Sequence, residues 1–423
     1  MVATRAQRSA AAARAALSPE VRRALQSEDV LACVLSLHAV KEGCVHSLAS
    51  VSKAWRAAWR RRCKDRCRLL RTQIGDFRHA IHVTALANGG AIVADYGHFK
   101  LEAFSPDGDP QTIYCERFET PGAIALLGDG TAWMLAQDRE AVCLVRWQDG
   151  VGAQQPAHRW PNGWNHDGNW RDPYGRILRH VDFNALSASE ELSSCLHPFD
   201  LAVSGDRLLV LCGGSLFGRI CVLDSQTGAF LHQIGPAREA GEADELRVPR
   251  SLAVHQDLCF VADTCNHAIK IFNFRQRELV RTIGSPAAAP TFPTTRDSDD
   301  DDEVDPYYIL SGYEDARRSD LPCEFNEPVG VAFLDGRLYV SEWGGRRIQI
   351  LRFASGIHGP VECLQIIPSP NGLELAGLCL SGDRLWCMGG NGGSVRWVPS
   401  LVAGVNGTVW TSNSCMHLFA AYV

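Results

Sequence analysis

The sequence lacks the features that mark several large classes of protein. No apolar run in its 423 residues approaches the roughly 18 that cross a bilayer, so we expect no membrane partner. It also lacks the G-x-S-x-G turn of many hydrolases, the phosphate-binding P-loop and the H-E-x-x-H zinc motif. We therefore expect a chain that is not an enzyme and that holds neither a cofactor nor a metal.

Disulfide clusters are missing as well, although the sequence has 16 cysteines. They are scattered along the chain, and four that fall inside predicted strands are Cys212, Cys221, Cys259 and Cys379. Buried free thiols in a reducing compartment explain this distribution, so we expect a cytoplasmic or nuclear protein.

A hairpin pattern occurs three times, at Val93 to Phe104, Val261 to Phe272 and Val340 to Leu351. Each copy has an apolar strand that ends in an acidic residue, a short polar turn, and a second strand of alternating apolar and polar side chains. Six turns rich in Gly, Asp or Asn separate such strands, near Asn88, Gly128, Gly205, Asp257, Asp335 and Gly382. Units of about 40 residues with four short strands are typical of β-propeller blades. The pattern predicts an all-β, six-bladed propeller over residues 69–423, or seven blades if residues 406–423 form another.

Two pairs of successive turns are separated by many more residues than the others. These long separations predict two inserted loops, at residues 152–197 and 285–325. The letters I-G close predicted outer strands at Gly235 and Gly284, and they also occur before the first unit, at Gly75. An N-terminal strand that completes the last blade would explain this and would remove a free sheet edge. We expect the ring to close in this way.

The units that begin at Pro249 and Pro328 resemble NHL repeats, with VADTCNHAIKIF inside the first and Pro-Val-Gly at the start of the second. The resemblance implies a six-bladed propeller. Some members of this class read RNA through a basic face, and some similar propellers are lyases or lactonases with a metal in the central channel. His82, His197 and His255 are conceivable channel ligands, although they occupy different offsets within their units.

Charge divides the chain into two parts. Residues 1–71 carry 15 Lys and Arg against 5 Asp and Glu, a net charge of +10, which leaves −16 for the rest of a chain whose total is −6. A basic module attached to an acidic propeller predicts different partners for the two parts. Residues 1–24 are rich in Ala and Arg, as in a transit peptide, but we favour a disordered lead-in.

Residues 25–68 predict a small helical module, because apolar side chains recur there at helical spacing. The segments EDVLACVLSLHAV and SLASVSKAWRAAW resemble an F-box, although Leu25-Gln26 stands where that family has Leu-Pro. The resemblance implies docking onto the adaptor, and through it the cullin, of an SCF-type ubiquitin ligase. The residues that would bind the adaptor are Leu31, Val34, Leu35, Leu48, Val51 and Trp55. Packing of the same apolar stripe against the propeller is the alternative.

The stretch from Lys53 to Arg71 is strongly basic and contains Trp55 and Trp59. Such a stretch can bind nucleic acid or the surface of an anionic membrane. The alternative, which we favour, is a solvated helix face that continues as the linker into the propeller.

Three segments of the propeller are candidates for contact with a target protein. The first insert carries Trp160, Trp164, Trp170 and Tyr174 on a turn-rich backbone, and the third hairpin carries Trp343, Arg346 and Arg347. Trp, Tyr and Arg are the residue types that dominate interface energies. In the second insert, Ser298 precedes four aspartates and resembles a site for an acidophilic kinase.

Together these features predict a non-catalytic substrate receptor of an SCF-type ubiquitin ligase. The alternative is an RNA-binding or scaffold propeller, which the negative charge of the propeller disfavours unless Arg346, Arg347 and Lys270 cluster. A lyase-like or lactonase-like enzyme with a metal in its channel ranks third.

Overall fold

The computed structural model describes residues 67–78, 80–95, 98, 100–116, 121–136, 141–146, 177–183, 186, 197–213, 217–235, 245–284, 319–381, 384–390 and 414–420. The chain forms two units, of which the second, Arg68–Ala421, contains nearly all of these residues. Residues 25–66 of the predicted F-box-like module lie outside the described residues, and its last residue, Arg68, is the first of a strand, β1 (Arg68–Phe77). Among the residues that are described, no helix has the length and hydropathy needed to cross a bilayer.

The second unit contains six antiparallel sheets, and the first three follow each other along the chain. The first sheet consists of β2 (Ala80–Ala85), β3 (Ala91–Asp95), β4 (Lys100–Phe104) and β5 (Pro110–Glu116). The second consists of β6 (Pro121–Leu126), β7 (Thr131–Ala136), β8 (Ala141–Arg146) and β9 (Ile177–Asp182). The third consists of β10 (His197–Ser204), β11 (Arg207–Gly213), β12 (Phe217–Asp224) and β13 (Phe230–Ile234), with β14 (Leu246–Arg247) paired to β12.

The other three sheets follow the same order of strands until the last one closes on the start of the chain. The fourth sheet consists of β15 (Pro249–His255), β16 (Leu258–Asp263), β17 (Ala268–Asn273) and β18 (Glu278–Gly284), with the 3-10 turn η3 (Thr264–Asn266) between β16 and β17. The fifth consists of β19 (Pro328–Leu334), β20 (Arg337–Glu342), β21 (Arg347–Phe353) and β22 (Val361–Pro368). The sixth begins after the 3-10 turn η4 (Pro370–Gly372) and consists of β23 (Glu374–Ser381), β24 (Arg384–Gly390), β25 (Ser414–Ala420) and β1 (Arg68–Phe77).

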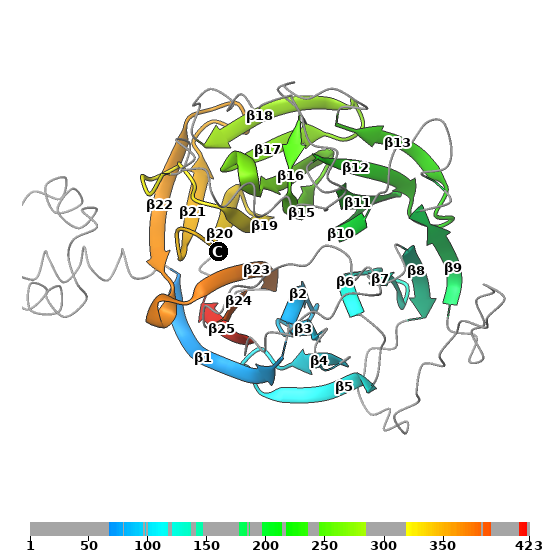
Figure 1. Ribbon diagram of the computed structural model, residues 1–423, viewed down its shortest axis with the longest axis horizontal. Helices are drawn as coiled ribbons and strands as arrows, with labels where there is room; N and C mark the ends of the chain where they lie inside the picture. The colour runs from blue at the N-terminus through cyan, green and yellow to red at the C-terminus, as the bar shows by residue number, and fades with distance from the viewer. Residues whose placement is uncertain are drawn as a thin grey trace, which may run out of the picture. The chain divides into compact units, whose positions relative to one another are not determined.

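The six sheets stand around a common axis. The first strand of each sheet packs against the first strand of the next, in the order β2, β6, β10, β15, β19 and β23, and β23 returns to β2 (Figure 1). This arrangement confirms the prediction of an all-β propeller.

Ring closure is achieved by the N-terminal strand, as expected. β1 is the outer strand of the sixth sheet and pairs antiparallel with β25, with Arg68 opposite Ala420. The glycine of each repeated I-G pair has a positive φ, which is +74° at Gly75, +103° at Gly235 and +129° at Gly284. A Cβ atom at position 284 would lie 2.6 Å from the carbonyl oxygen of His267, so only glycine fits there.

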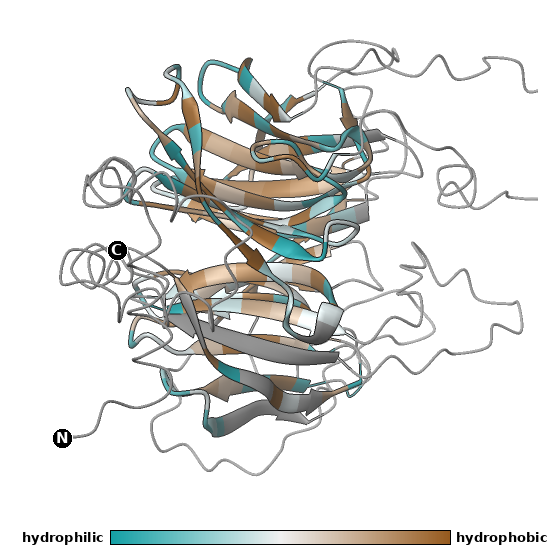
Figure 2. Cartoon of the chain, turned by 90° about the vertical axis from the view of Figure 1, so that its left-hand side faces the viewer, coloured by the Kyte–Doolittle hydropathy of each residue, from teal (hydrophilic) through white to brown (hydrophobic). Residues whose placement is uncertain are grey.

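The core lies between neighbouring sheets. The sequence of β11, RLLVLCG, contains a continuous apolar run. The reason is that its two faces pack against two different sheets. Leu208 packs in a cluster with Trp133 of the second sheet, and Leu209 packs in a cluster with Phe272 of the fourth. Figure 2 shows the resulting distribution, with hydrophobic strands inside and hydrophilic turns at the ends. Strands buried on both faces lose the alternation of a surface strand.

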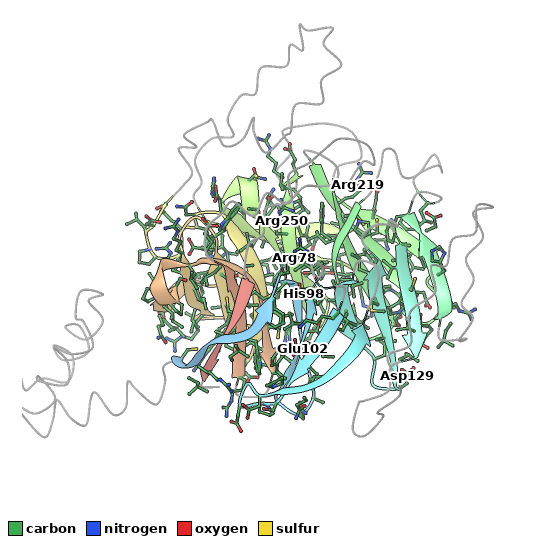
Figure 3. The ribbon with its side chains drawn as sticks, turned by 60° about the horizontal axis from the view of Figure 1, so that its bottom comes forward. Arg78, His98, Glu102, Asp129, Arg219 and Arg250 are labelled. Carbon is green, nitrogen blue, oxygen red and sulfur yellow. The ribbon has the colours of Figure 1, made fainter. Side chains whose placement is uncertain are left out.

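The acidic residue at the end of each repeated hairpin strand is fully buried and holds the chain that leads into the inner strand. In each case a carboxylate oxygen accepts a hydrogen bond from a backbone N–H located two residues before that strand. The three bonds are Arg78 to Asp95 at 3.2 Å, Arg247 to Asp263 at 2.7 Å, and Asn326 to Glu342 at 2.8 Å. Figure 3 labels Arg78 and His98, whose Nδ1 lies 2.7 Å from Asp95 Oδ2. The repeated acid is therefore a structural clasp.

The predicted inserts differ from the structure at their ends. β9 lies within residues 152–197, so that range includes the fourth strand of the second sheet. Its letters, ILRHVD, lack a strong apolar signal because an outer strand faces solvent on one side, and Leu178 is exposed. Phe325, the last residue of the second range, is fully buried in the core.

Candidate functional site

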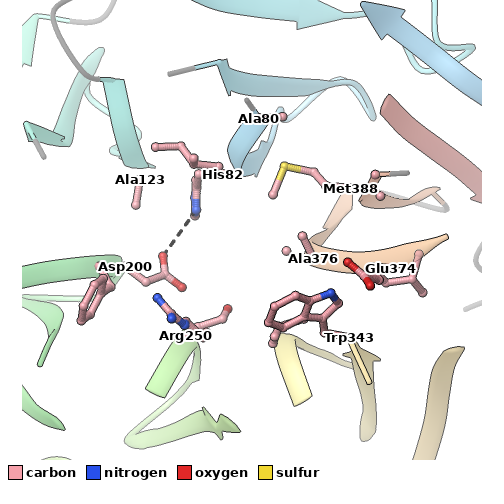
Figure 4. A pocket seen from close by; sticks show the side chains of 17 residues that line it. Ala80, His82, Ala123, Asp200, Arg250, Trp343, Glu374, Ala376 and Met388 are labelled. Atoms are coloured by element: carbon pink, nitrogen blue, oxygen red, sulfur yellow. Dashed lines mark ion pairs between the residues drawn. The ribbon is translucent and has the colours of Figure 1, made fainter. Parts of the chain in front are cut away.

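A small pocket opens at the end of the propeller where the inner strands begin. It has a volume of about 70 Å³ and is lined by residues from all six sheets. Ala376, Gly377, Gly389 and Gly390 contribute little side-chain bulk to its wall. Figure 4 shows His82, Asp200 and Arg250 on one side of this mouth pocket, with Trp343 and Glu374 on the other.

His82 and Asp200 form the polar pair of the pocket. The Nδ1 atom of His82 lies 3.6 Å from Oδ1 of Asp200, and both side chains are largely buried. Two backbone N–H groups, of Leu201 and Leu252, each donate a 2.8 Å hydrogen bond to the Asp200 carboxylate. These bonds hold the carboxylate at the start of β10 and join β10 to β15.

Burial sets the protonation behaviour of this pair. It lowers the pKa of the His82 imidazole, and the charge of Asp200 offsets this only in part. Burial likewise raises the pKa of the Asp200 carboxyl, against the opposing effects of His82 and of the backbone hydrogen bonds. Desolvation disfavours the charged form of each group. The neutral imidazole and the neutral carboxyl are therefore more favoured here than they are for the same groups in water.

The other side of the mouth pocket depends on the turn between β20 and β21. The N–H of Trp343 donates a 2.8 Å hydrogen bond to the carbonyl oxygen of Glu327, next to the clasp made by Glu342. Glu374, the first residue of β23, directs one carboxylate oxygen to Arg346 at 3.5 Å. Its other oxygen, Oε2, is buried without a hydrogen-bond partner among the described residues.

The central channel continues below this pocket. A cavity of about 280 Å³ is lined by the middle residues of all six inner strands, most of them apolar. His82, Asp200 and Ser251 line both the channel and the mouth pocket. The polar pair therefore lies where the two spaces meet.

The part of the chain that the structure describes contains no group of three or more His, Cys, Asp or Glu side chains able to hold a metal ion. Of the two candidate channel histidines whose side chains are described, His82 lines the mouth pocket and His255 does not. His255 is the last residue of β15, at the opposite end of the strand, where its ring lies 5.0 Å from that of Phe333. The side chain of His197 lies outside the described residues.

Trp343 and Arg346 were predicted as target-binding residues. Trp343 lines the mouth pocket. Arg346 is not part of the lining, but its guanidinium lies 3.5 Å from Glu374, which is part of it. Arg347, predicted with them, is 7% exposed, and its Nε donates a 2.7 Å hydrogen bond to Glu342. Its guanidinium also bonds backbone carbonyls such as that of Glu324 at 3.0 Å. Arg347 is therefore committed to the fold and is not available to a partner.

The basic cluster that would favour RNA binding does not form on the described surface. Lys270 is 5% exposed and lies 3.2 Å from the Asp263 carboxylate, and Arg347 is also buried. Only Arg346 of the three presents its charge to solvent, with an exposed fraction of 55%.

Several predicted site residues lie outside the described residues, so their roles stay predictions. They are Leu31, Val34, Leu35, Leu48, Val51 and Trp55 of the F-box-like segment, Trp160, Trp164, Trp170 and Tyr174 of the first insert, and Ser298 of the second.

The sequence analysis missed Asp200, Arg250 and Glu374. A signal for the first was present, because the unit at Pro328 reads Pro-Val-Gly whereas the unit at Pro198 reads Pro-Phe-Asp. Asp200 therefore stands at the position that Gly330 occupies in the other unit. Its carboxylate lines the pocket and the channel at the axis of the ring. Arg250 and Glu374 have no such signature, since charged residues are common at strand ends.

Comparison with known proteins gives no family for this chain. No family model matches it, and no curated protein matches its sequence. Among solved structures, it is similar to a luciferin-regenerating enzyme, with a TM-score of 0.48, 10% identity, and coverage of 84% of this chain and 95% of that chain.

Two other solved structures are similar at the same level. A chain of a nidogen–laminin complex has a TM-score of 0.42 and 13% identity, with 70% of this chain and 83% of that chain covered. Virginiamycin B lyase from Staphylococcus aureus has a TM-score of 0.41 and 12% identity, with 77% and 84% covered. No function of this chain follows from these similarities.

Proposed function

We propose that this chain is a non-catalytic substrate receptor of an SCF-type ubiquitin ligase. In this proposal the propeller binds a target protein at the mouth pocket, and the F-box-like segment docks on the adaptor of the ligase. The receptor raises the effective concentration of its target near the ubiquitin-transferring subunits.

The observation that carries the propeller half of the proposal is the composition of the mouth pocket. Trp343 lines it from the turn between β20 and β21, and Arg250 and Glu374 line it from the starts of two inner strands. Arg346, from the same turn as Trp343, lies 3.5 Å from Glu374. Trp and Arg are among the residue types enriched in the side chains that carry most of the binding energy of protein interfaces. The pocket is also too small to enclose a large cofactor.

The N-terminal half of the proposal is supported by residues 25–68, whose sequence resembles an F-box. The NHL-like letters of the units at Pro249 and Pro328 support a repeat propeller that presents loops to a partner. The described cysteines Cys212, Cys221 and Cys259 are buried free thiols, and burial raises the pKa of Cys259. Such thiols are typical of proteins of the cytoplasm or nucleus, and we propose that location.

The test is co-purification of partners with the full chain from host cells. Three tagged proteins are compared: the wild type, a variant with Leu31→Ala, Leu35→Ala and Val51→Ala, and the single variant Trp343→Ala. The triple variant is expected to lose the adaptor and cullin while keeping target proteins. Trp343→Ala is expected to do the reverse. Recovery of adaptor and cullin in equal amounts with all three proteins contradicts the F-box assignment.

A further inference from the structure

The mouth pocket is lined by Glu374, whose carboxylate has only one long contact with a cation among the described residues. Glu374 directs Oε1 toward Arg346 at a distance of 3.5 Å, which is long for a charged pair. Its Oε2 atom is buried and has no hydrogen-bond partner among the described residues. The described residues therefore compensate the Glu374 carboxylate only through one long contact, and the 20% of this side chain that is exposed is where a ligand can supply a further donor.

The surroundings of this oxygen favour a cationic donor. Trp343 and Glu374 both line the pocket, and Figure 4 shows the indole ring beside the carboxylate. A cation held by a carboxylate and placed near an aromatic face gains from both interactions. Two positive charges are already nearby. Arg346 belongs to a side chain that is 55% exposed and therefore well screened by water. Arg250 lines the opposite side of the pocket, beside Asp200.

The size of the pocket limits what can enter. Its volume of about 70 Å³ corresponds to roughly five water molecules, since one needs about 10–15 Å³ measured in this way. Gly377, Gly389 and Gly390 in the wall leave room for a slender group rather than for a sugar or a nucleotide. The end of a Lys or Arg side chain has these dimensions and carries the required charge.

We propose that the mouth pocket takes one basic side chain, of Lys or Arg, from the target protein. The charged group lies on Glu374, and the aliphatic part of the side chain packs against Trp343. This inference rests on the proposed function, because it names the kind of residue that the receptor recognises.

The opposite chemistry is an acidic side chain bound by Arg250. The guanidinium of Arg250 lies over the Phe199 ring, 5.6 Å from its centroid. That guanidinium is therefore already in contact with an aromatic ring, and the buried Asp200 side chain lines the same side of the pocket. The two chemistries are distinguished by the test.

The experiment is a ligand-observed NMR titration of the full chain with four capped amino acids. The N-acetyl N-methylamides of lysine and arginine represent the proposed group. The same derivative of norleucine is the uncharged match for lysine, and that of glutamate is the opposite charge. The proteins are the wild type, Glu374→Gln and a matched control, Glu362→Gln, which removes a carboxylate that is 50% exposed and pairs with Arg352 on the outer strands. Circular dichroism and thermal unfolding establish that all three proteins are folded.

The expected result is that the lysine or the arginine probe binds the wild type, and that Glu374→Gln weakens this binding about tenfold or more. Glu362→Gln is expected to leave it unchanged, and norleucine to bind at least tenfold more weakly than lysine. The inference is overturned if no probe binds the folded wild type, if glutamate is preferred, or if Glu374→Gln binds the basic probes as the wild type does.

These outcomes are separate from the test of the ligase role. Binding of the basic probes together with failure to recover adaptor and cullin refutes the ligase role alone. Recovery of adaptor and cullin without binding of the probes refutes only the basic side chain as the recognised group.

Discussion

His82 Nδ1 and Asp200 Oδ1 lie 3.6 Å apart, although they come from the first and third sheets of the ring. The sheet that begins with β6 separates the two in the ring, yet its residue at this position, Ala123, is too small to reach the pair. The contact therefore links two blades that are not neighbours. It also puts a buried imidazole at the junction of the mouth pocket and the channel.

The first prediction concerns the pH dependence of stability. Burial lowers the pKa of His82 below its ordinary value of 6.5, so the folded protein binds fewer protons at this site than the unfolded chain. The contribution is present above the unfolded pKa and is lost as the pH falls below it. We expect the midpoint temperature of unfolding of the wild type to decrease when the pH is lowered from 7.5 to about 5.5. The decrease is expected to be smaller in His82→Gln.

Two other groups, His232 and Asp200, also contribute to the pH dependence. Burial also lowers the pKa of His232, so part of the fall is expected in both proteins. Asp200, whose pKa is raised by burial, contributes stability that is lost as the pH rises through its folded value, which opposes the effect of His82. Replacing His358, which is exposed, with Gln is expected to change nothing. Identical pH profiles for the wild type and His82→Gln contradict the assignment.

A second prediction concerns the clasp at Asp263. This carboxylate accepts hydrogen bonds from Arg247 N–H and Asn266 Nδ2, both at 2.7 Å, and lies 3.2 Å from Lys270 Nζ. Asp263→Asn removes the charge opposite the buried Lys270 ammonium, so we expect a loss of about 3–5 kcal/mol in the free energy of unfolding. Urea unfolding measures it.

The matched control for the clasp is Asp257→Asn. Asp257 forms a 2.7 Å ion pair with Arg275, but both side chains are roughly half exposed. Exposed pairs contribute little, so we expect a change below about 1 kcal/mol. Equal effects of the two substitutions show that the repeated acid is not a structural clasp.

The third prediction tests ring closure through the N-terminal strand. Phe77 of β1 is fully buried and packs edge-on against Phe104 of the first sheet, with ring centroids 5.8 Å apart. Phe77→Ala is expected to lower the free energy of unfolding by about 3–5 kcal/mol, because it leaves a cavity between the sixth and first sheets. Leu70→Ala, in the same strand at an exposed position, is expected to change it by less than about 0.5 kcal/mol. A mild effect of Phe77→Ala means that β1 is dispensable for the ring.

A fourth prediction concerns target binding. Trp343→Ala removes the aromatic wall of the mouth pocket, and we expect the loss of most target proteins recovered with the full chain, equivalent to about 2 kcal/mol or more. Leu231→Ala, at an exposed position on the outer strand β13, serves as the control and is expected to recover the wild-type set. Quantitative mass spectrometry compares the three purifications. Unchanged recovery with Trp343→Ala places the target elsewhere.

Much of the fold was predictable because strands buried on both faces leave a strong pattern. The segments that end at Asp263 and Glu342 were recognised as strands, and β16 and β20 end at those residues. Outer strands gave weaker signals, as β9 shows, because they contact one sheet only and carry polar residues on the other face. The I-G letters at Gly75 predicted the closing strand because they encode a backbone conformation rather than a side chain.

Less of the site was predictable. Arg347 has the residue type of a binding site, but a basic residue five positions after Glu342 is close enough along the hairpin to neutralise it inside the fold. Glu374 gains its role from its place beside Trp343, a residue of another sheet, and this proximity is not encoded in any local pattern. The mouth pocket is assembled from six sheets, so only the tertiary structure reveals it.

The central claim is that this chain brings a target to an SCF-type ligase, and direct binding to the purified adaptor–cullin complex tests it most closely. Calorimetric titration of the full chain is expected to give saturable binding with a 1:1 ratio. The variant with Leu31→Ala, Leu35→Ala and Val51→Ala is expected to lose it, with the thermal unfolding of the propeller unchanged. Absence of binding by a folded wild-type chain, or binding that the triple variant retains in full, contradicts the account.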